Sequence, residues 1–232
     1  MQMDPHNQNH LSAHAGKGSL QAELNEMIRK FTREVPDEVQ SVMRNALKAM
    51  ADSGVAEECL RIGMRPLDFT LNNQYGKPVN LEQTLQRGPV VISFFRGMWC
   101  PYCSLELQAL QQALSAINAS DATLLAISPQ TPEQTHDTAQ KFNLSFDVLS
   151  DAGNNVAASF GLVLSLPEML HPIYTNFGFD LPSHNGDDSY ELPMAATYVL
   201  DRNGLIRLAF TDTDYTKRLE PAEIIACLRS LY

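Results

Sequence analysis

The chain has 232 residues, of which 44% are hydrophobic and 19% charged, and this composition excludes a disordered protein and fits one globular domain with an extension. It carries 17 Lys and Arg against 27 Asp and Glu, and the resulting net charge of −10 argues against nucleic acid or an anionic membrane as a partner. The four cysteines are too few for a disulfide framework in a chain of this length.

The first segment, residues 1–19, is polar and lacks the apolar run of a secretory signal, so we expect a disordered tail. The sequence contains no run of about 18 apolar residues, and we expect no membrane span. The default compartment is then the cytoplasm, where cysteines stay reduced and cysteine pairs tend to be catalytic or metal-binding.

Residues 20–60 predict a helical N-terminal extension. Apolar residues recur at helical spacing from Leu20 to Phe31 and again from Val39 to Met50, and Pro36 between them suits a first helical position. We expect the two helices to pack on the main domain, with a homodimer contact as the alternative.

Strands and helices then alternate over residues 61–232. Apolar runs predict buried strands at Val90–Phe95, Ala122–Ile127 and Phe146–Leu149. Asn-Gly and similar turns predict two hairpins, over residues 69–81 and 195–210. Capping residues and apolar stripes predict helices at Pro101–Ile117, Thr131–Phe142, Asn155–Phe160 and Leu219–Leu231. Together they predict a mixed α/β sandwich, in which a central sheet is flanked by helices.

Residues 161–194 interrupt this alternation. The segment holds Pro167, Pro172 and Pro182 and the acidic turn at Asp187 and Asp188, and it predicts a mostly irregular insertion with one short helix. Long irregular segments inside a compact domain are typical of lids and binding loops.

The pattern with the most chemical content is Trp99-Cys100-Pro101-Tyr102-Cys103, which follows a buried strand and opens a helix. Pro101 suits the first helical position and places Cys100 at the cap, where free N–H groups and the helix dipole stabilise a thiolate. Cys103 continues the apolar stripe of the helix, so we expect it to be the more buried thiol with the higher pKa. Cys100 would then attack a substrate, and Cys103 would close a disulfide.

Other interpretations of the cysteines have less support. A structural zinc site requires further ligands, and no second cysteine pair is present. His6, His10 and His14 lie in the polar N-terminal segment, where a weak metal site is the alternative to a solvated tail. We expect no metal and no other cofactor. Cys59 and Cys227 are isolated in the sequence, and we interpret them as structural thiols.

Several segments resemble the alkyl hydroperoxide reductase/thiol-specific antioxidant family, the peroxiredoxins, within the thioredoxin-like superfamily. They are Phe94–Glu106, Leu125–Glu133, Phe146–Asp151 and Thr197–Arg207. The resemblance covers about Arg61 to Leu231 and implies a thioredoxin-like fold, a hydroperoxide substrate, and a thioredoxin- or glutaredoxin-type reductant.

The chain departs from the family pattern at its centre. Peroxiredoxins carry a Pro-x-x-x-Thr-x-x-Cys motif and a later Arg that polarises the peroxide. Alignment on the family places the peroxidatic cysteine at Cys103, with Arg96 at the Pro position and Cys100 at the Thr position. The later Arg maps to Ala195. The family alignment therefore favours Cys103 as the attacking sulfur, whereas the helix-cap argument favours Cys100.

Three functions follow from these residues. The first is a thiol-dependent peroxidase in which Arg96 replaces the missing donors beside Cys100 and Cys103. The second is a thiol–disulfide oxidoreductase that uses the same pair without peroxide chemistry. The third is a non-catalytic redox sensor or binding module, with the acidic loop at Asp187 and Asp188 as its contact surface.

Overall fold

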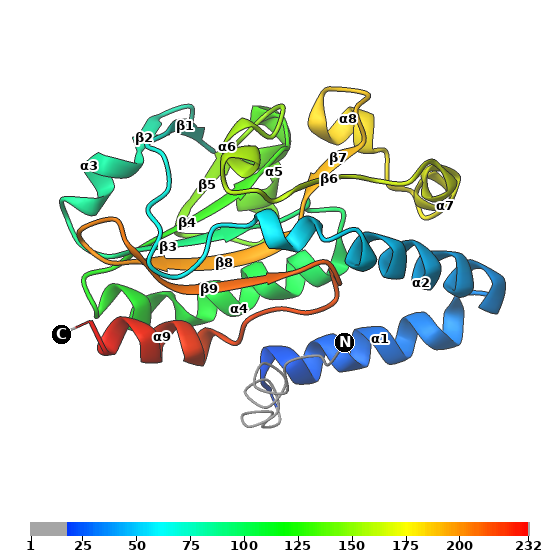
Figure 1. The fold of residues 1–232 in the computed structure, drawn as a ribbon, viewed down its shortest axis with the longest axis horizontal. Coiled ribbons are helices and arrows are strands. Elements are labelled where there is room, and N and C mark those ends of the chain that lie inside the picture. The colour runs from blue at the N-terminus through cyan, green and yellow to red at the C-terminus, as the bar shows by residue number, and fades with distance from the viewer. Residues whose placement is uncertain (1–17, 232) are drawn as a thin grey trace.

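The computed structural model describes residues 18–231, so the tail predicted over residues 1–19 lies almost entirely outside the described residues. Its centre is a mixed sheet in which β2 (Pro78–Asn80) and β1 (Thr70–Asn73) form one edge, and the strand order is β2-β1-β5-β4-β3-β8-β9 (Figure 1). The inner strands β3 (Val90–Phe94), β4 (Thr123–Ser128) and β5 (Asp147–Ser150) run parallel. At the other edge, β8 (Ala195–Leu200) and β9 (Ile206–Asp212) run antiparallel to their neighbours. The predicted central sheet and its C-terminal hairpin are confirmed.

One face of the sheet is covered by long helices. Successive side chains of a strand point to opposite faces, and Val91 of β3 and Ala126 of β4 point to this one. They pack in one core with α1 (Leu20–Glu34), α4 (Pro101–Asn118) and α9 (Pro221–Arg229). This layer places the helix that begins at the cysteine pair directly against the central strands.

The opposite face is covered by short helices. Ile92 and Leu125, each one residue along its strand from the first set, pack here against α3 (Leu81–Leu85) and α6 (Asn155–Ser159). The remaining peripheral elements are a short 3-10 helix at Val55–Glu58, the hairpin strands β1 (Thr70–Asn73) and β2 (Pro78–Asn80), and the helix α5 (Pro132–Lys141) beside β5.

The two predicted N-terminal helices are present as α1 and α2 (Asp37–Asp52) and lie at one end of the sheet in Figure 1. The apolar stripe of α1 packs on α4 within the core of the main body. The turn between the helices is closed by Gln40, whose amide donates to the carbonyl oxygens of Thr32 at 3.0 Å and Val35 at 2.7 Å. The division of the chain at residue 60 and the homodimer stay predictions.

The insertion at 161–194 is more regular than predicted. It forms a two-stranded sheet, a short 3-10 helix and two α-helices: β6 (Val163–Ser165), β7 (Glu191–Pro193), Glu168–Leu170, α7 (His171–Asn176) and α8 (Leu181–Asn185). The expectation of one short helix was wrong because Pro172 and Pro182 stand in the first turns of α7 and α8, where proline begins a helix instead of breaking one. The β6–β7 pairing joins segments far apart in the chain, which periodicity cannot reveal.

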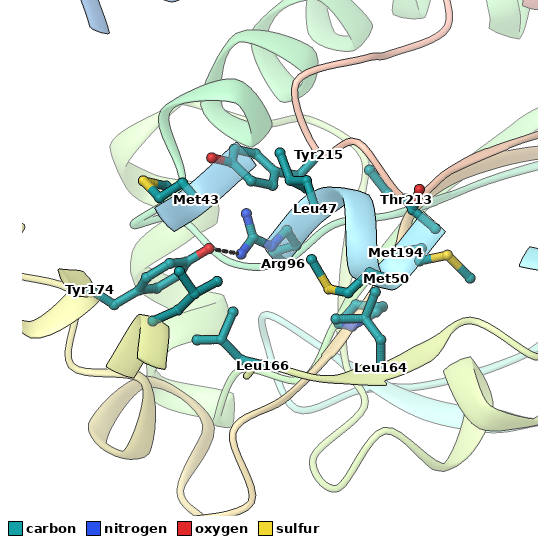
Figure 2. A pocket seen from close by; sticks show the side chains of 13 residues that line it. Met43, Leu47, Met50, Arg96, Leu164, Leu166, Tyr174, Met194, Thr213 and Tyr215 are labelled. Carbon is teal, nitrogen blue, oxygen red and sulfur yellow. Dashed lines mark hydrogen bonds between the residues drawn. The ribbon is translucent and has the colours of Figure 1, made fainter. Parts of the chain in front are cut away.

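The insertion and α2 share a third apolar core. Met43 and Ala46 of α2 pack with Leu166, Leu170 and Tyr174 of the insertion. Figure 2 shows Met43 and Tyr174 among the side chains around Arg96. Both elements therefore reach the loop that precedes the cysteine pair. None of the helices within residues 18–231 is long and apolar enough to cross a membrane.

Candidate active site

The loop between β3 and α4 carries the predicted site. Its backbone turns at Gly97, which has a φ of 149°, a conformation that residues with a side chain rarely adopt. A Cβ atom at Gly97 would lie 2.3 Å from Nε1 of Trp99. Glycine is therefore required for the indole to fold back over the loop.

The turn after β4 holds this loop in place. The amide N–H of Met98 donates to Oε1 of Gln130 at 2.8 Å, and the Gln130 side chain is fully buried. Gln130 in turn donates to the Thr138 hydroxyl at 3.1 Å. Buried hydrogen-bond networks with every member paired rigidify their surroundings. The position of the cysteines is therefore linked to α5 as well as to β3.

Cys100 occupies the N-cap of α4, and Pro101 stands in its first turn, as the sequence predicts. The sulfur is buried, with 1% of the residue exposed. Burial opposes ionisation, but the hydrogen bond from the Cys103 thiol and the charges of Arg96 and Arg218 outweigh it and lower the pKa of Cys100 to about 5. A thiol with this pKa is a thiolate at neutral pH, the form that acts as a nucleophile.

Cys103 lies one turn further along α4 and is fully buried. Its sulfur receives two hydrogen bonds, from the backbone N–H of Arg96 at 3.4 Å and from Nη2 of Arg218 at 3.3 Å. Burial and the neighbouring Cys100 sulfur raise the pKa of Cys103 above its ordinary value in spite of the two cations. The cysteines are both free thiols in this structure.

Arg218 is a residue of the candidate site that the sequence does not predict. Its guanidinium is 1% exposed and lies between Cys103 and Glu106, donating from Nε to Oε2 of Glu106 at 2.7 Å. It also donates to the carbonyl oxygens of Tyr215 and Lys217. Next to Lys217 in the sequence, Arg218 has the pattern of a solvated basic residue before a helix, and no local feature indicates burial.

Arg96 lies at the end of β3, as the sequence predicts, but it is neither solvated nor ion-paired. It is 5% exposed, and among the described residues it forms no salt bridge with a carboxylate. Its guanidinium lies over the rings of Trp99, Tyr174 and Tyr215 at 5.0, 5.5 and 4.4 Å from their centroids. It donates a hydrogen bond to the Tyr174 hydroxyl, drawn as a dashed line in Figure 2. The rings hold the cation by its attraction to their π faces.

A cleft of about 480 Å³ leads from the surface to Cys100. Cys100 and Arg96 line the cleft, whereas Cys103 does not. The other lining residues are mainly aromatic or apolar and include Met27, Lys30, Phe31, Trp99, Tyr174, Phe177, Phe179 and Tyr215. Apolar clefts of this size with a few polar groups are typical of small-molecule sites. Arg96 and Tyr174 also line a smaller cavity of about 20 Å³, the one shown in Figure 2.

Comparison with known proteins identifies the family. The pattern of the AhpC/TSA family matches residues 62–209, more than half of the chain. The chain belongs to this family. It is a peroxiredoxin, a thiol peroxidase, which implies a hydroperoxide substrate and a thiol reductant.

Individual peroxiredoxins agree with this assignment. The chain is 30% identical over 150 residues to chloroplastic peroxiredoxin Q of Sedum lineare, covering 65% of this chain and 68% of that protein. It is also 30% identical to chloroplastic peroxiredoxin Q of Suaeda salsa, of which it spans 59%. Among solved structures, the peroxidoxin BcpB of Mycobacterium tuberculosis superposes with a TM-score of 0.59 at 22% identity, over 75% of this chain and 99% of that one. The predicted thioredoxin-like fold is thereby confirmed.

The segment that matches the family does not contain every residue of the candidate site. Helix α1, with Phe31 on the cleft wall, precedes residue 62, and Arg218 follows residue 209. Ala195, where the family alignment places the later arginine, is a buried residue of β8. The arginine that the family pattern has at this position is therefore absent, and any cation that takes its role must come from another part of the chain.

The other two cysteines of the peroxiredoxin lie outside the cleft lining. Cys59 packs in the core on the opposite face of the sheet and donates to the Gly161 carbonyl oxygen at 3.4 Å, while Cys227 is half-buried on α9. Burial raises the pKa of both thiols. Within residues 18–231, no three His, Cys, Asp or Glu side chains gather closely enough to hold a metal ion.

Proposed function

We propose that this peroxiredoxin reduces hydroperoxides through its Cys100–Cys103 pair. The Cys100 thiolate attacks the terminal oxygen of the hydroperoxide, the O–O bond breaks, and the alkoxide takes a proton and leaves as an alcohol or water. Cys100 is left as a sulfenic acid. The Cys103 sulfur then attacks the Cys100 sulfur, water leaves, and a disulfide closes.

The observation that carries the proposal is the position of Cys100 at the inner end of the cleft. Its sulfur combines a helix N-cap, a lowered pKa and access to the cleft, and Arg96 lines the same cleft beside it. Arg96 is a fixed cation at the place where negative charge develops on the leaving oxygen, the arrangement that stabilises such a transition state. The cleft is in this view the path of the substrate.

A second assignment exchanges the two sulfurs. It is favoured by the two hydrogen bonds onto Cys103 Sγ, from Arg96 N–H and Arg218, because such donors stabilise a thiolate. The family alignment also favours Cys103. Against it stand the complete burial of Cys103, its raised pKa and its absence from the cleft lining.

Single-cysteine variants distinguish the two assignments. Reduced Cys100→Ser and Cys103→Ser proteins are each mixed with equimolar hydrogen peroxide, and the sulfenic acid is trapped with dimedone and located by mass spectrometry. The proposal expects trapping at Cys100 in Cys103→Ser and none in Cys100→Ser. Trapping at Cys103 in Cys100→Ser would instead support the second assignment.

The same experiment on the unsubstituted protein tests the pair mechanism as a whole. Rapid loss of two thiols with formation of a Cys100–Cys103 disulfide supports it. Slow reaction with peroxide but rapid exchange with a disulfide substrate would support a thiol–disulfide oxidoreductase. Slow reaction with both would leave a redox sensor or binding module.

The remaining proposals concern the surroundings of the reaction. We propose a thioredoxin- or glutaredoxin-type protein as the reductant, because the disulfide formed by a closely spaced cysteine pair is reduced by thiol exchange. The cytoplasm is the proposed compartment, since such a pair must be returned to the dithiol. Residues 20–60 are proposed to act as an extension that completes the cleft, not as a separate domain.

A further inference from the structure

The contacts of Arg218 differ from those of Arg96 in a way that separates their tasks. Arg218 touches the inner sulfur, Cys103 Sγ, at 3.3 Å, and it is absent from the cleft lining. Its other donors are occupied by Glu106 and by the backbone carbonyls of Tyr215 and Lys217. It lies outside the segment that matches the family. Arg218 is therefore placed to act on Cys103 and not on a hydroperoxide in the cleft.

We infer that Arg218 is a catalytic residue of the reductive half-reaction, in which it stabilises the Cys103 sulfur as this sulfur leaves the Cys100–Cys103 disulfide as a thiolate. The inference rests on the roles of the two cysteines proposed above. It assigns to Arg218 a step that follows peroxide reduction and that the cleft residues do not serve.

The step balances as a thiol–disulfide exchange. A thiolate of a dithiol reductant attacks Cys100 Sγ, the sulfur that lines the cleft, and forms a mixed disulfide with it. The Cys100–Cys103 bond breaks, and its electron pair goes to Cys103 Sγ. The second thiol of the reductant then displaces Cys100 as a thiolate, and the reductant leaves as a disulfide. Cys103 finally takes a proton to regenerate the dithiol.

Burial makes a stabilising group necessary in this step. Cys103 is fully buried, and a negative charge without a partner is costly in such a place. A leaving thiolate that is stabilised leaves faster. The guanidinium of Arg218 and the backbone N–H of Arg96 are the two donors that the structure provides to this sulfur. Arg218 stays protonated, because Cys103 and Glu106 outweigh burial and raise its pKa.

Glu106 is the positioning residue of this arrangement. It lies on α4 one turn beyond Cys103, is 2% exposed, and accepts from Arg218 Nε at 2.7 Å. The carboxylate fixes the plane of the guanidinium so that Nη2 faces the sulfur. Loss of Glu106 should therefore weaken the same step as loss of Arg218, and to a smaller extent.

The test measures the two half-reactions separately by stopped flow at pH 8, where Cys100 remains a thiolate even if its pKa rises by about two units. The variants are Arg218→Met, Arg218→Lys and the double variant Arg218→Met/Glu106→Gln, which removes both members of the buried ion pair in case the single change prevents folding. Arg65→Met, in an exposed ion pair with Glu82, is the matched control. The oxidised proteins are reduced with dithiothreitol, and the reduced proteins are oxidised with hydrogen peroxide.

We expect reduction to slow by about tenfold or more in Arg218→Met and in the double variant, with peroxide oxidation within about threefold of the parent, and a smaller effect in Arg218→Lys. In a Cys100→Ser background, Arg218→Met should also move the ultraviolet titration of the Cys103 thiolate to higher pH. Unchanged reduction in a folded double variant would overturn the inference. Peroxide oxidation slowed as much as reduction would overturn it as well. The dimedone experiment above tests the cysteine roles independently of either result.

Discussion

The guanidinium carbon of Arg96 lies 4.4 Å from the ring centroid of Tyr215, while its Nη2 donates to the hydroxyl of Tyr174. Tyr174 comes from the insertion, and Tyr215 follows the last strand. Two distant segments therefore hold one cation beside Cys100. This arrangement makes Arg96 a fixed electrostatic feature of the cleft.

We expect Arg96→Ala to lower the second-order rate constant for peroxide by more than about tenfold, because the change removes a cation from beside both the thiolate and the leaving oxygen. The rate is measured at pH 8 by stopped flow, which separates the effect on the leaving oxygen from the effect on ionisation. Arg65→Ala, in an exposed ion pair, is the control and should leave the rate unchanged. An unchanged rate in Arg96→Ala would remove Arg96 from the mechanism.

The lowered pKa of Cys100 predicts a specific pH dependence. The thiolate is the reactive form and exists above the pKa, so the peroxide rate should fall as pH drops through about 5 and be constant above about pH 6. The ultraviolet absorbance of the thiolate should titrate with the same midpoint. This low-pH step should be absent in Cys100→Ser, where the remaining thiols have raised pKa values and titrate only at higher pH. In Cys103→Ser, the midpoint should change, because the Cys103 thiol is a hydrogen-bond partner of this thiolate. A midpoint near the ordinary value of about 8.5 would contradict the electrostatic description of the site.

Gly97→Ala should destabilise the protein by about 3 kcal/mol, since the backbone has a φ of 149° and the new Cβ would meet the Trp99 ring. The ring cannot move easily because Phe179 and Tyr174 pack against it at centroid distances of 5.2 and 5.7 Å. The free energy of unfolding is measured in urea. Gly63→Ala is the matched control, because Gly63 also has a positive φ but no atom within 4 Å of the added Cβ. Equal losses in the two variants would mean that the contact with Trp99 carries no cost.

Phe31→Ala should reduce the preference for a bulky hydroperoxide. Phe31 of α1 lines the cleft and meets Phe177 edge to face at 6.3 Å, so its loss removes apolar surface from the wall. We expect kcat/KM for cumene hydroperoxide to fall about fivefold more than that for hydrogen peroxide, which is too small to touch the wall. Arg29→Ala, an exposed change on the same helix, should alter neither value. Equal decreases for the two peroxides would show that α1 does not contact the substrate.

The parts of the site that the sequence predicts are the local ones. The strand Val90–Phe94 is apolar at nearly every position, and all of its residues are buried. The Cys-Pro step marks the start of α4, because proline at the first turn and a capping residue before it are short-range requirements. The apolar stripe on α4 likewise places Cys103 in the core. Each of these inferences depends on residues within a few positions of one another.

The parts that could not be predicted depend on contacts across the chain. Arg218 reaches Cys103 from a loop that carries no periodic pattern, and a buried arginine looks like a solvated one until its partners are known. Tyr174 comes to Arg96 through the pairing of β6 with β7 and through the core shared with α2. Such contacts are set by tertiary packing, which a single sequence does not display.

The placement of both sulfurs in the first turn of α4 has a consequence for damage by excess peroxide. A cysteine sulfenic acid that waits for a distant partner can meet a second peroxide and become a sulfinic acid, a form that thiols do not reduce. In the proposed cycle, Cys103 already contacts Cys100 through a hydrogen bond before any peroxide arrives. The disulfide can close without unfolding a segment of the chain, so the vulnerable form is short-lived. A cysteine pair of this kind favours resistance to irreversible oxidation at high peroxide concentration.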